Sequence, residues 1–162
     1  SWTTFYTDKL NQTYVIKTEA LNAIDANWQA MATRGDEAFW QSETLRNNFA
    51  PTTFIKNGNT TFGVQQYIEG TLHTNPIDPI FESIVPYVKQ NGVVMQDWLN
   101  NIITDGQGNF IVIDTGRAFS TQTPIDTIID TITLSETDIT NALNANFRPV
   151  TTTEDNFFDQ FK

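Results

Sequence analysis

The stretch VVMQDWLNNIITDGQGNFIVIDTGRAF, residues 93–119, decides the fold, because it sets three polar side chains among residues that belong in a core. These are Asp97, Asn101 and Asp114. Residues 102–113 read as two short apolar strands around the turn DGQGN. Since the turn folds these strands back on each other, we expect Asn101 and Asp114 to lie near one another. A carboxylate at the end of a buried strand is costly unless it is paired, so Asp114 needs a cation, a metal or a set of hydrogen-bond donors.

This arrangement predicts a magnesium site. An Asn carbonyl and an Asp carboxylate are oxygen ligands that Mg²⁺ accepts, with phosphate oxygens and water completing the shell. Asp97 lies four residues before Asn101, on the loop that approaches the same point, where it could accept a proton or orient a nucleophile. A purely local interpretation stays open, in which Asp97 caps a turn and Asn101 satisfies nearby backbone.

Composition narrows the class of protein. The chain of 162 residues fits one domain with a real core, and four Trp and twelve Phe favour a packed globule. A net charge of −10 disfavours nucleic acid as a partner. No long apolar run or signal peptide is visible, so we expect a soluble protein with no membrane contact. The absence of Cys and the single residue His73 exclude thiolate and multi-histidine metal sites.

The first half of the chain alternates strands and helices. Residues 2–18 predict an antiparallel hairpin, and the spacing of apolar residues from Leu21 is helical. We expect Gly35 to stop this helix and Asp36 to cap a second short helix that ends near residue 47. TTFIK and TTFGVQQYI, within residues 52–68, predict a second hairpin around Asn-Gly.

The second half is mostly helical. A loop over residues 71–79 leads into a helix that carries Pro86 and ends at Gly92. Beyond the 102–113 hairpin, Thr123-Pro124 predicts the start of another helix. SETD at 135–138 predicts a capping box for a last helix that ends near residue 147, and an acidic tail with three Phe follows, as core or as a docking segment. The chain is therefore predicted to be α+β.

The order Asp, Asn, strand, turn, strand, Asp-x-Gly resembles the catalytic core of the protein-kinase-like superfamily. MQDWLNN and DTG resemble that family's H-R-D-x-x-x-x-N loop and D-F-G motif. The resemblance runs from about residue 2 to residue 119. It implies a two-lobed fold, with a β-rich N-lobe over residues 1–69 and a much reduced helical C-lobe over residues 70–162.

The resemblance also implies a role for particular residues. TYVIKT resembles the strand whose lysine contacts the nucleotide phosphates, which points to Lys17. Its acidic partner on the following helix is then Glu43, with Glu37 as the alternative. Gln65 takes the gatekeeper place before the hinge. The backbone groups that would face adenine belong to Gln66, Tyr67 and Ile68.

At the phosphate end of the site the resemblance implies Mg²⁺ bound by Asn101 and Asp114, with Asp97 orienting the incoming hydroxyl. Several features depart from the family pattern. No Gly-rich loop is visible, Met95 and Gln96 replace the usual His and Arg, and Thr115 replaces the usual Phe. The spacing from Asp97 to Asn101 is one residue short.

The function expected from the resemblance is an atypical protein kinase that transfers the ATP γ-phosphoryl group to a protein hydroxyl. The main alternative is a pseudokinase that acts as a binding module for a partner protein. A small-molecule phosphotransferase and an acidic interaction domain without a nucleotide site also stay open. Small kinases of this kind resemble those that bacteria deliver into host cells and those of phages and mobile elements, so the expected location is cytoplasmic or inside a host cell.

Overall fold

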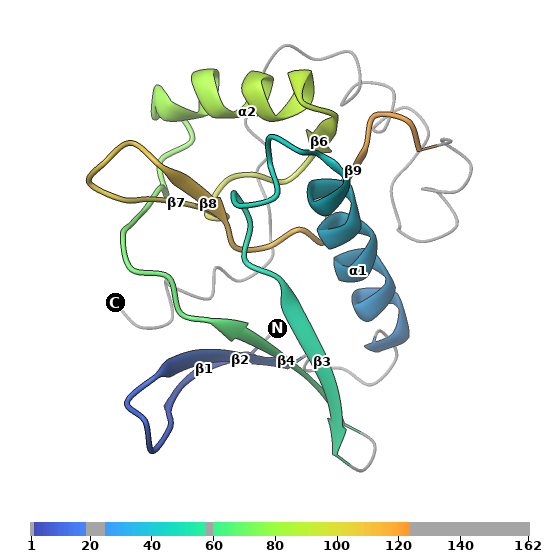
Figure 1. Cartoon of the computed structure of the whole chain (residues 1–162), viewed down its shortest axis with the longest axis vertical. Helices are drawn as coiled ribbons and strands as arrows, with labels where there is room; N and C mark the ends of the chain where they lie inside the picture. Colours follow the sequence, from blue (N-terminus) through green and yellow to red (C-terminus); the bar gives the residue numbers. More distant parts are fainter. Residues whose placement is uncertain (1, 19–24, 58–59, 124–162) are drawn as a thin grey trace.

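A computed structural model describes residues 2–18, 25–57 and 60–123 (Figure 1). The helices predicted beyond Thr123 and the acidic tail lie outside the described residues. The described part is a mixed α+β structure with antiparallel sheets and two helices, which confirms the predicted class.

Both predicted hairpins of the first half are present in one four-stranded sheet. Its strands pair antiparallel in the order β1-β2-β4-β3. Asp8 closes the first turn, since its Oδ1 atom accepts hydrogen bonds from the backbone N–H groups of Leu10 and Gln12, both at 2.9 Å. The bounds are β1 (Trp2–Thr7), β2 (Thr13–Thr18), β3 (Thr52–Asn57) and β4 (Thr60–Gln66).

The first helix corrects the sequence interpretation. A single helix, α1 (Asp25–Gln41), replaces the two short helices that were expected to meet at Gly35. Gly35 lies within the helix and does not end it. It faces the chain after β8 so closely that a Cβ atom at this position would overlap the carbonyl oxygen of Thr115. The glycine thus permits close packing of α1, and Asp36, expected to be a cap, lies inside the helix.

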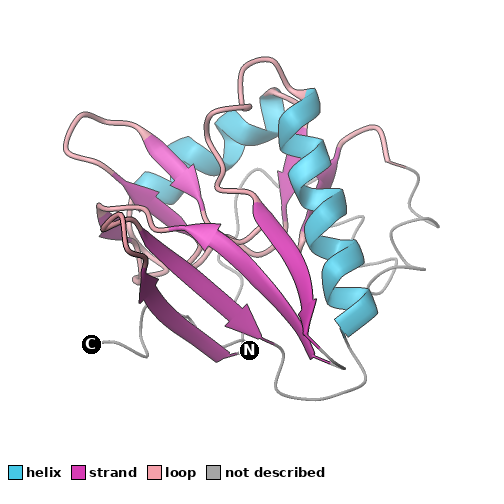
Figure 2. Ribbon diagram, turned by 60° about the horizontal axis from the view of Figure 1, so that its bottom comes forward, coloured by secondary structure: helices cyan, strands magenta, loops and turns pink. Residues whose placement is uncertain are grey.

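Figure 2 shows α1 lying along the edge of the four-stranded sheet that β3 forms. An edge-to-face contact between the rings of Trp28 and Phe54 fixes this position, with ring centroids 4.9 Å apart. On the opposite strand β4, Gly63 leaves room for the Trp28 ring. The other end of α1 packs against β9.

Five short strands follow. One pair of them lies between the two strands of another pair in the sequence, and these four are called the nested strands below. The predicted hairpin of β7 (Ile102–Thr104) and β8 (Phe110–Val112) is present, with β5 (Thr71–Leu72) added at its edge. Outside it, β6 (Val93–Met95) pairs antiparallel with β9 (Ala118–Ser120). The sequence analysis did not predict β5, β6 or β9.

The second predicted helix is present as α2 (Ile80–Gln90), which contains Pro86 and is followed by Gly92 at a φ of 99°. Its buried face joins the largest core cluster together with α1 and the nested strands. Within this cluster Trp98 packs on Phe81, with ring centroids 4.2 Å apart. No helix of the described ranges has the length and apolar character needed to cross a membrane.

Candidate functional site

The nested strand pairs determine where the polar loops lie. The outer pair aligns Met95 with Ala118, and the inner pair aligns Ile102 with Val112. Residues 96–101 and 113–117 are the two segments that connect the outer pair to the inner one. The first segment contains Asp97 and Asn101, and the second contains Asp114, so the sheet topology holds all three residues in one small region.

Hydrogen bonds fix the two segments to each other. The backbone N–H of Ile113 donates to the carbonyl oxygen of Asn101 at 2.9 Å, directly before Asp114. The Asn101 amide Nδ2 donates to the carbonyl oxygen of Asp97 at 3.2 Å. Both Asp97 and Asn101 are buried. The proximity of Asn101 to Asp114 that the turn predicted is therefore present.

Lys17 reaches this region from strand β2. Its side chain is buried, and its Nζ atom donates a 2.8 Å hydrogen bond to the carbonyl oxygen of Ile113. Burial lowers the pKa of Lys17, while the carboxylates of Asp114 and Asp36 oppose that shift by attraction. The Lys17 side chain from β2 and the Asp114 carboxylate after β8 are thus close enough to interact electrostatically.

The acidic side chain of α1 that interacts with Lys17 is Asp36, whereas the resemblance pointed to Glu43, with Glu37 as the alternative, and a role for either glutamate stays a prediction. Glu43 is exposed and follows the end of α1, and Glu37 is exposed on the helix itself. Asp36 accepts hydrogen bonds from the Thr115 hydroxyl at 2.7 Å and from the backbone N–H of Thr52 at 3.2 Å. Burial raises the pKa of Asp36 to about 6, although both hydrogen bonds and the charge of Lys17 lower it.

Asp36 was not among the predicted site residues, because the helix break expected at Gly35 made it a helix cap. A usable signal was present: with an unbroken helix, Asp36 stands one turn after Ala32 and one residue after a glycine that permits close approach. Thr115 was noted only as a departure from the family pattern, yet its buried hydroxyl contacts Asp36.

Gln65, expected at the gatekeeper place, is almost fully buried at the junction of the sheets. Its Nε2 atom lies 2.9 Å from the carbonyl oxygens of Ala50 and Ile113. The same Ile113 carbonyl therefore accepts hydrogen bonds from Gln65 and Lys17. One backbone oxygen next to Asp114 ties two strands of the four-stranded sheet to the nested strands.

The proposed adenine-facing residues directly follow strand β4. Gln66 is exposed and pairs with Tyr14 of β2. The Tyr67 backbone N–H donates to the carbonyl oxygen of Thr13 at 3.2 Å, so that N–H group is occupied within the sheet. Ile68 packs at the margin of a small apolar cluster that Val15 and two further residues form, Ile103 and Ile113.

Asn101 and Asp114 carry an amide oxygen and a carboxylate, which are ligands of the kind that Mg²⁺ accepts. One oxygen of the Asp114 carboxylate, Oδ1, accepts the backbone N–H of Gly116 at 2.9 Å, which fixes that carboxylate toward its own turn. Among the described residues no group of three or more His, Asp or Glu side chains could hold a metal. A site of one carboxylate and one amide oxygen needs substrate phosphates and water to complete six ligands, as Mg²⁺ sites in nucleotide enzymes commonly do.

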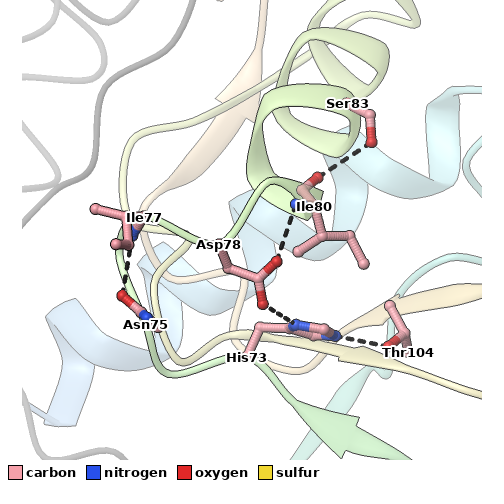
Figure 3. A network of polar contacts seen from close by, with 7 residues as sticks. All are labelled: His73, Asn75, Ile77, Asp78, Ile80, Ser83 and Thr104. Carbon is pink, nitrogen blue, oxygen red and sulfur yellow. Dashed lines mark hydrogen bonds and ion pairs between the residues drawn. The ribbon is translucent and has the colours of Figure 1, made fainter.

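A second polar network lies between β5 and the start of α2 (Figure 3). His73 Nδ1 lies 2.8 Å from Asp78 Oδ2, and His73 Nε2 lies 2.6 Å from the Thr104 hydroxyl. Asp78 also accepts the backbone N–H of Ile80 through Oδ1 at 3.0 Å, at the first turn of α2. These contacts tie the β5 to α2 connection to the end of β7.

A comparison of the sequence with models of known protein families and with curated proteins finds no match. Function is therefore inferred from the residues and their geometry.

Proposed function

We propose that this protein is an atypical kinase with a two-lobed, kinase-like arrangement, which transfers the γ-phosphoryl group of ATP to a protein hydroxyl. One observation supports this proposal above all others. Lys17, from a strand near the start of the sequence, donates to the Ile113 carbonyl oxygen at 2.8 Å, and the Ile113 backbone N–H donates to the Asn101 carbonyl oxygen at 2.9 Å, so these contacts bring Lys17 and Asn101 to the residue before Asp114. A buried lysine that interacts with the Asp114 carboxylate, close to the Asn101 segment, suits a bound Mg²⁺–triphosphate.

In this proposal the Lys17 ammonium binds the α- and β-phosphates. Its burial lowers its pKa but also excludes water, which strengthens the attraction of the charged form for phosphate, and the carboxylates of Asp114 and Asp36 oppose the lowering. Phosphoryl transfer depends mainly on positioning and electrostatic stabilisation, so a fixed cation next to a fixed carboxylate supplies much of what the reaction needs.

Asn101 and Asp114 would hold Mg²⁺, which neutralises charge on the transferring group. Asp97 orients the incoming hydroxyl, as its place on the connecting segment before Asn101 suggests. The hydroxyl oxygen bonds to the γ-phosphorus while the bond to the β-phosphate oxygen breaks. ADP leaves with that electron pair, and the hydroxyl proton passes to the Asp97 carboxylate.

The test is a radiolabelled ATP assay with the protein itself and a cell lysate as acceptors. Wild type is expected to transfer label, and Asp114→Asn is expected to lose transfer by a factor of at least about a hundred, since it removes a charge-stabilising ligand. Glu43→Gln is the matched control: it changes an exposed carboxylate to an amide and should keep wild-type activity. A folded wild type that labels no protein would contradict the proposal.

A second candidate is a pseudokinase that binds nucleotide or a partner protein without turnover. It is favoured by the residues before Asp97, where buried Met95 and half-buried Gln96 supply no basic brace. Thermal unfolding with and without Mg-ATP discriminates, because a ligand that binds only the folded state raises its melting temperature. A rise in melting temperature without label transfer would identify this case.

A further inference from the structure

Thr115 links the two halves of the candidate site. The side chain is buried, and its hydroxyl oxygen lies 2.7 Å from Asp36 Oδ1 and 3.2 Å from the Ala32 carbonyl oxygen. The hydroxyl has one proton, and the shorter distance assigns it to the Asp36 carboxylate. Asp36 is the acid that lies near Lys17, and Thr115 directly follows Asp114, so one hydrogen bond connects the lysine part of the site to the carboxylate part.

The turn of α1 that contains Asp36 also contacts the residues after Thr115. Arg34 donates from Nη2 to the carbonyl oxygen of Gly116 at 3.1 Å and from Nε to that of Ala118 at 3.3 Å. The backbone of Gly35 lies against that of Thr115, too close to admit a Cβ atom. Residues 32–36 thus contact residues 115–118 through backbone packing and side-chain hydrogen bonds, and the Thr115 hydroxyl also reaches Asp36, the acid near Lys17.

We propose that Thr115 is a positioning residue, whose hydroxyl holds the segment of Asp114 against Asp36 and so keeps the site assembled. The effect of Thr115 on nucleotide binding rests on the proposed function. The contact of its hydroxyl with Asp36 does not depend on that function. The nearest carboxylate to the hydroxyl is Asp36, and Lys17 and Asp114 are the charged groups that act on Asp36. A hydrogen bond to a charged carboxylate, here a half-buried one, is stronger than a bond between neutral groups, which suits a fixed link.

Three variants separate the hydroxyl from the packing of the side chain. Thr115→Val keeps the shape and removes the hydroxyl, and Thr115→Ser keeps the hydroxyl and removes the methyl group. Thr74→Val makes the same change as the first variant at an exposed position outside the site and is the matched control.

The first readout is amide hydrogen exchange without ligand. Two backbone N–H groups report on the segment: Gly116, bonded to Asp114 Oδ1, and Ala118, bonded to the Thr115 carbonyl oxygen. Loss of a hydrogen bond to a charged group should speed their exchange about tenfold or more in Thr115→Val. Thr115→Ser and Thr74→Val should keep wild-type rates. Unchanged exchange in Thr115→Val would overturn the inference, and so would fast exchange in Thr115→Ser, because packing would then hold the segment.

The second readout is the affinity for Mn²⁺ with a non-hydrolysable ATP analogue, measured by calorimetry. Thr115→Val should bind about tenfold more weakly than wild type, with Thr115→Ser close to wild type. Equal affinity of Thr115→Val and wild type would overturn the role in ligand binding. If wild type binds no nucleotide, the proposed function fails, and the exchange rates of the ligand-free protein still decide whether the hydroxyl positions the segment.

Discussion

The Nζ atom of Lys17 donates a 2.8 Å hydrogen bond to the carbonyl oxygen of Ile113, a residue 96 positions later in the sequence. This bond places a buried ammonium beside Asp114 and joins the four-stranded sheet to the nested strands. Gln65 donates to the same oxygen at 2.9 Å. The region of Asp114 is therefore held by groups from two different strands of the sheet.

A double-mutant cycle should identify the acid that interacts with Lys17. Combining Lys17→Met with Asp36→Asn is expected to give a favourable coupling energy of about 1 kcal/mol or more, as for charges in one buried network. Combining Lys17→Met with Glu43→Gln should give a coupling near zero, because Glu43 is exposed beyond the end of α1. Urea unfolding of the single and double variants at pH 7 supplies the energies. A larger coupling to Glu43 than to Asp36 would restore the original assignment.

Asp36 should make stability depend on pH in an unusual direction. Its pKa is raised to about 6 in the folded protein, against an ordinary value of about 3.9 in an unfolded chain. Between these values the folded state binds a proton that the unfolded state has lost, so the contribution of Asp36 to stability falls as pH rises from about 4 to 6.

Asp36→Asn does not titrate, so the free energy of unfolding of this variant minus that of wild type should increase from pH 4 to pH 7. The expected increase is about 3 kcal/mol for a shift of about two pKa units. Urea unfolding at several pH values measures it. A difference that stays flat or decreases over this range is incompatible with a raised pKa.

Gly35→Ala should destabilise the protein even though alanine favours helices. Replacing a helical glycine by alanine gains up to about 1 kcal/mol, but the new Cβ atom would overlap the Thr115 carbonyl oxygen. Because backbone must move apart, we expect a net loss of about 1–2 kcal/mol in the free energy of unfolding. Gly106→Ala is the control, since a Cβ atom there meets nothing within 4 Å. Equal stability of the two variants would mean that α1 and Thr115 are not closely packed.

Helix α1 was predicted less well than the hairpins, because its course through Gly35 depends on residues far away in the sequence. The hairpins around residues 2–18 and 52–66 and the strand pair in 102–112 were predictable because each forms between neighbours along the chain. Local propensity at Gly35 favoured a break, whereas the packing of Thr115 against α1, which comes from a segment about eighty residues later, keeps the helix continuous.

In the candidate site, too, the local contacts were predictable from the sequence and the long-range contacts were not. The proximity of Asn101 and Asp114 followed from one short turn, so the sequence was sufficient. The partner of Lys17 depends on which face of α1 points to the nested strands, and α1 packs there against β9, which pairs with β6. These are three-residue strands, too short to be recognised by alternation, and they pair across the whole 102–112 hairpin.

His73→Phe should destabilise the connection between β5 and α2. The phenyl ring keeps the bulk of the side chain but leaves the Asp78 carboxylate and the Thr104 hydroxyl without their His73 contacts, at a cost of about 1–2 kcal/mol. The hydrogen bond with His73 lowers the pKa of Asp78, so the stability it contributes is present above the ordinary value of about 3.9 and is lost as pH falls.

An NMR titration of the Asp78 carboxyl group checks this: its pKa should rise toward the ordinary value in His73→Phe. The stability difference between wild type and the variant should also shrink below about pH 4. Thr74→Val is the nearby control, because this side chain is exposed. An unchanged Asp78 pKa would show that His73 does not stabilise the carboxylate.

The long separation of the contacting residues has a consequence during protein synthesis. Lys17 and Ile113 are 96 positions apart, and Arg34 and Ala118 are 84 apart. A ribosome adds roughly 5–20 residues each second, so the early hairpins have seconds to form before the residues that complete the site emerge. The nascent protein should therefore gain any capacity to bind nucleotide abruptly, when β9 leaves the exit tunnel and pairs with β6.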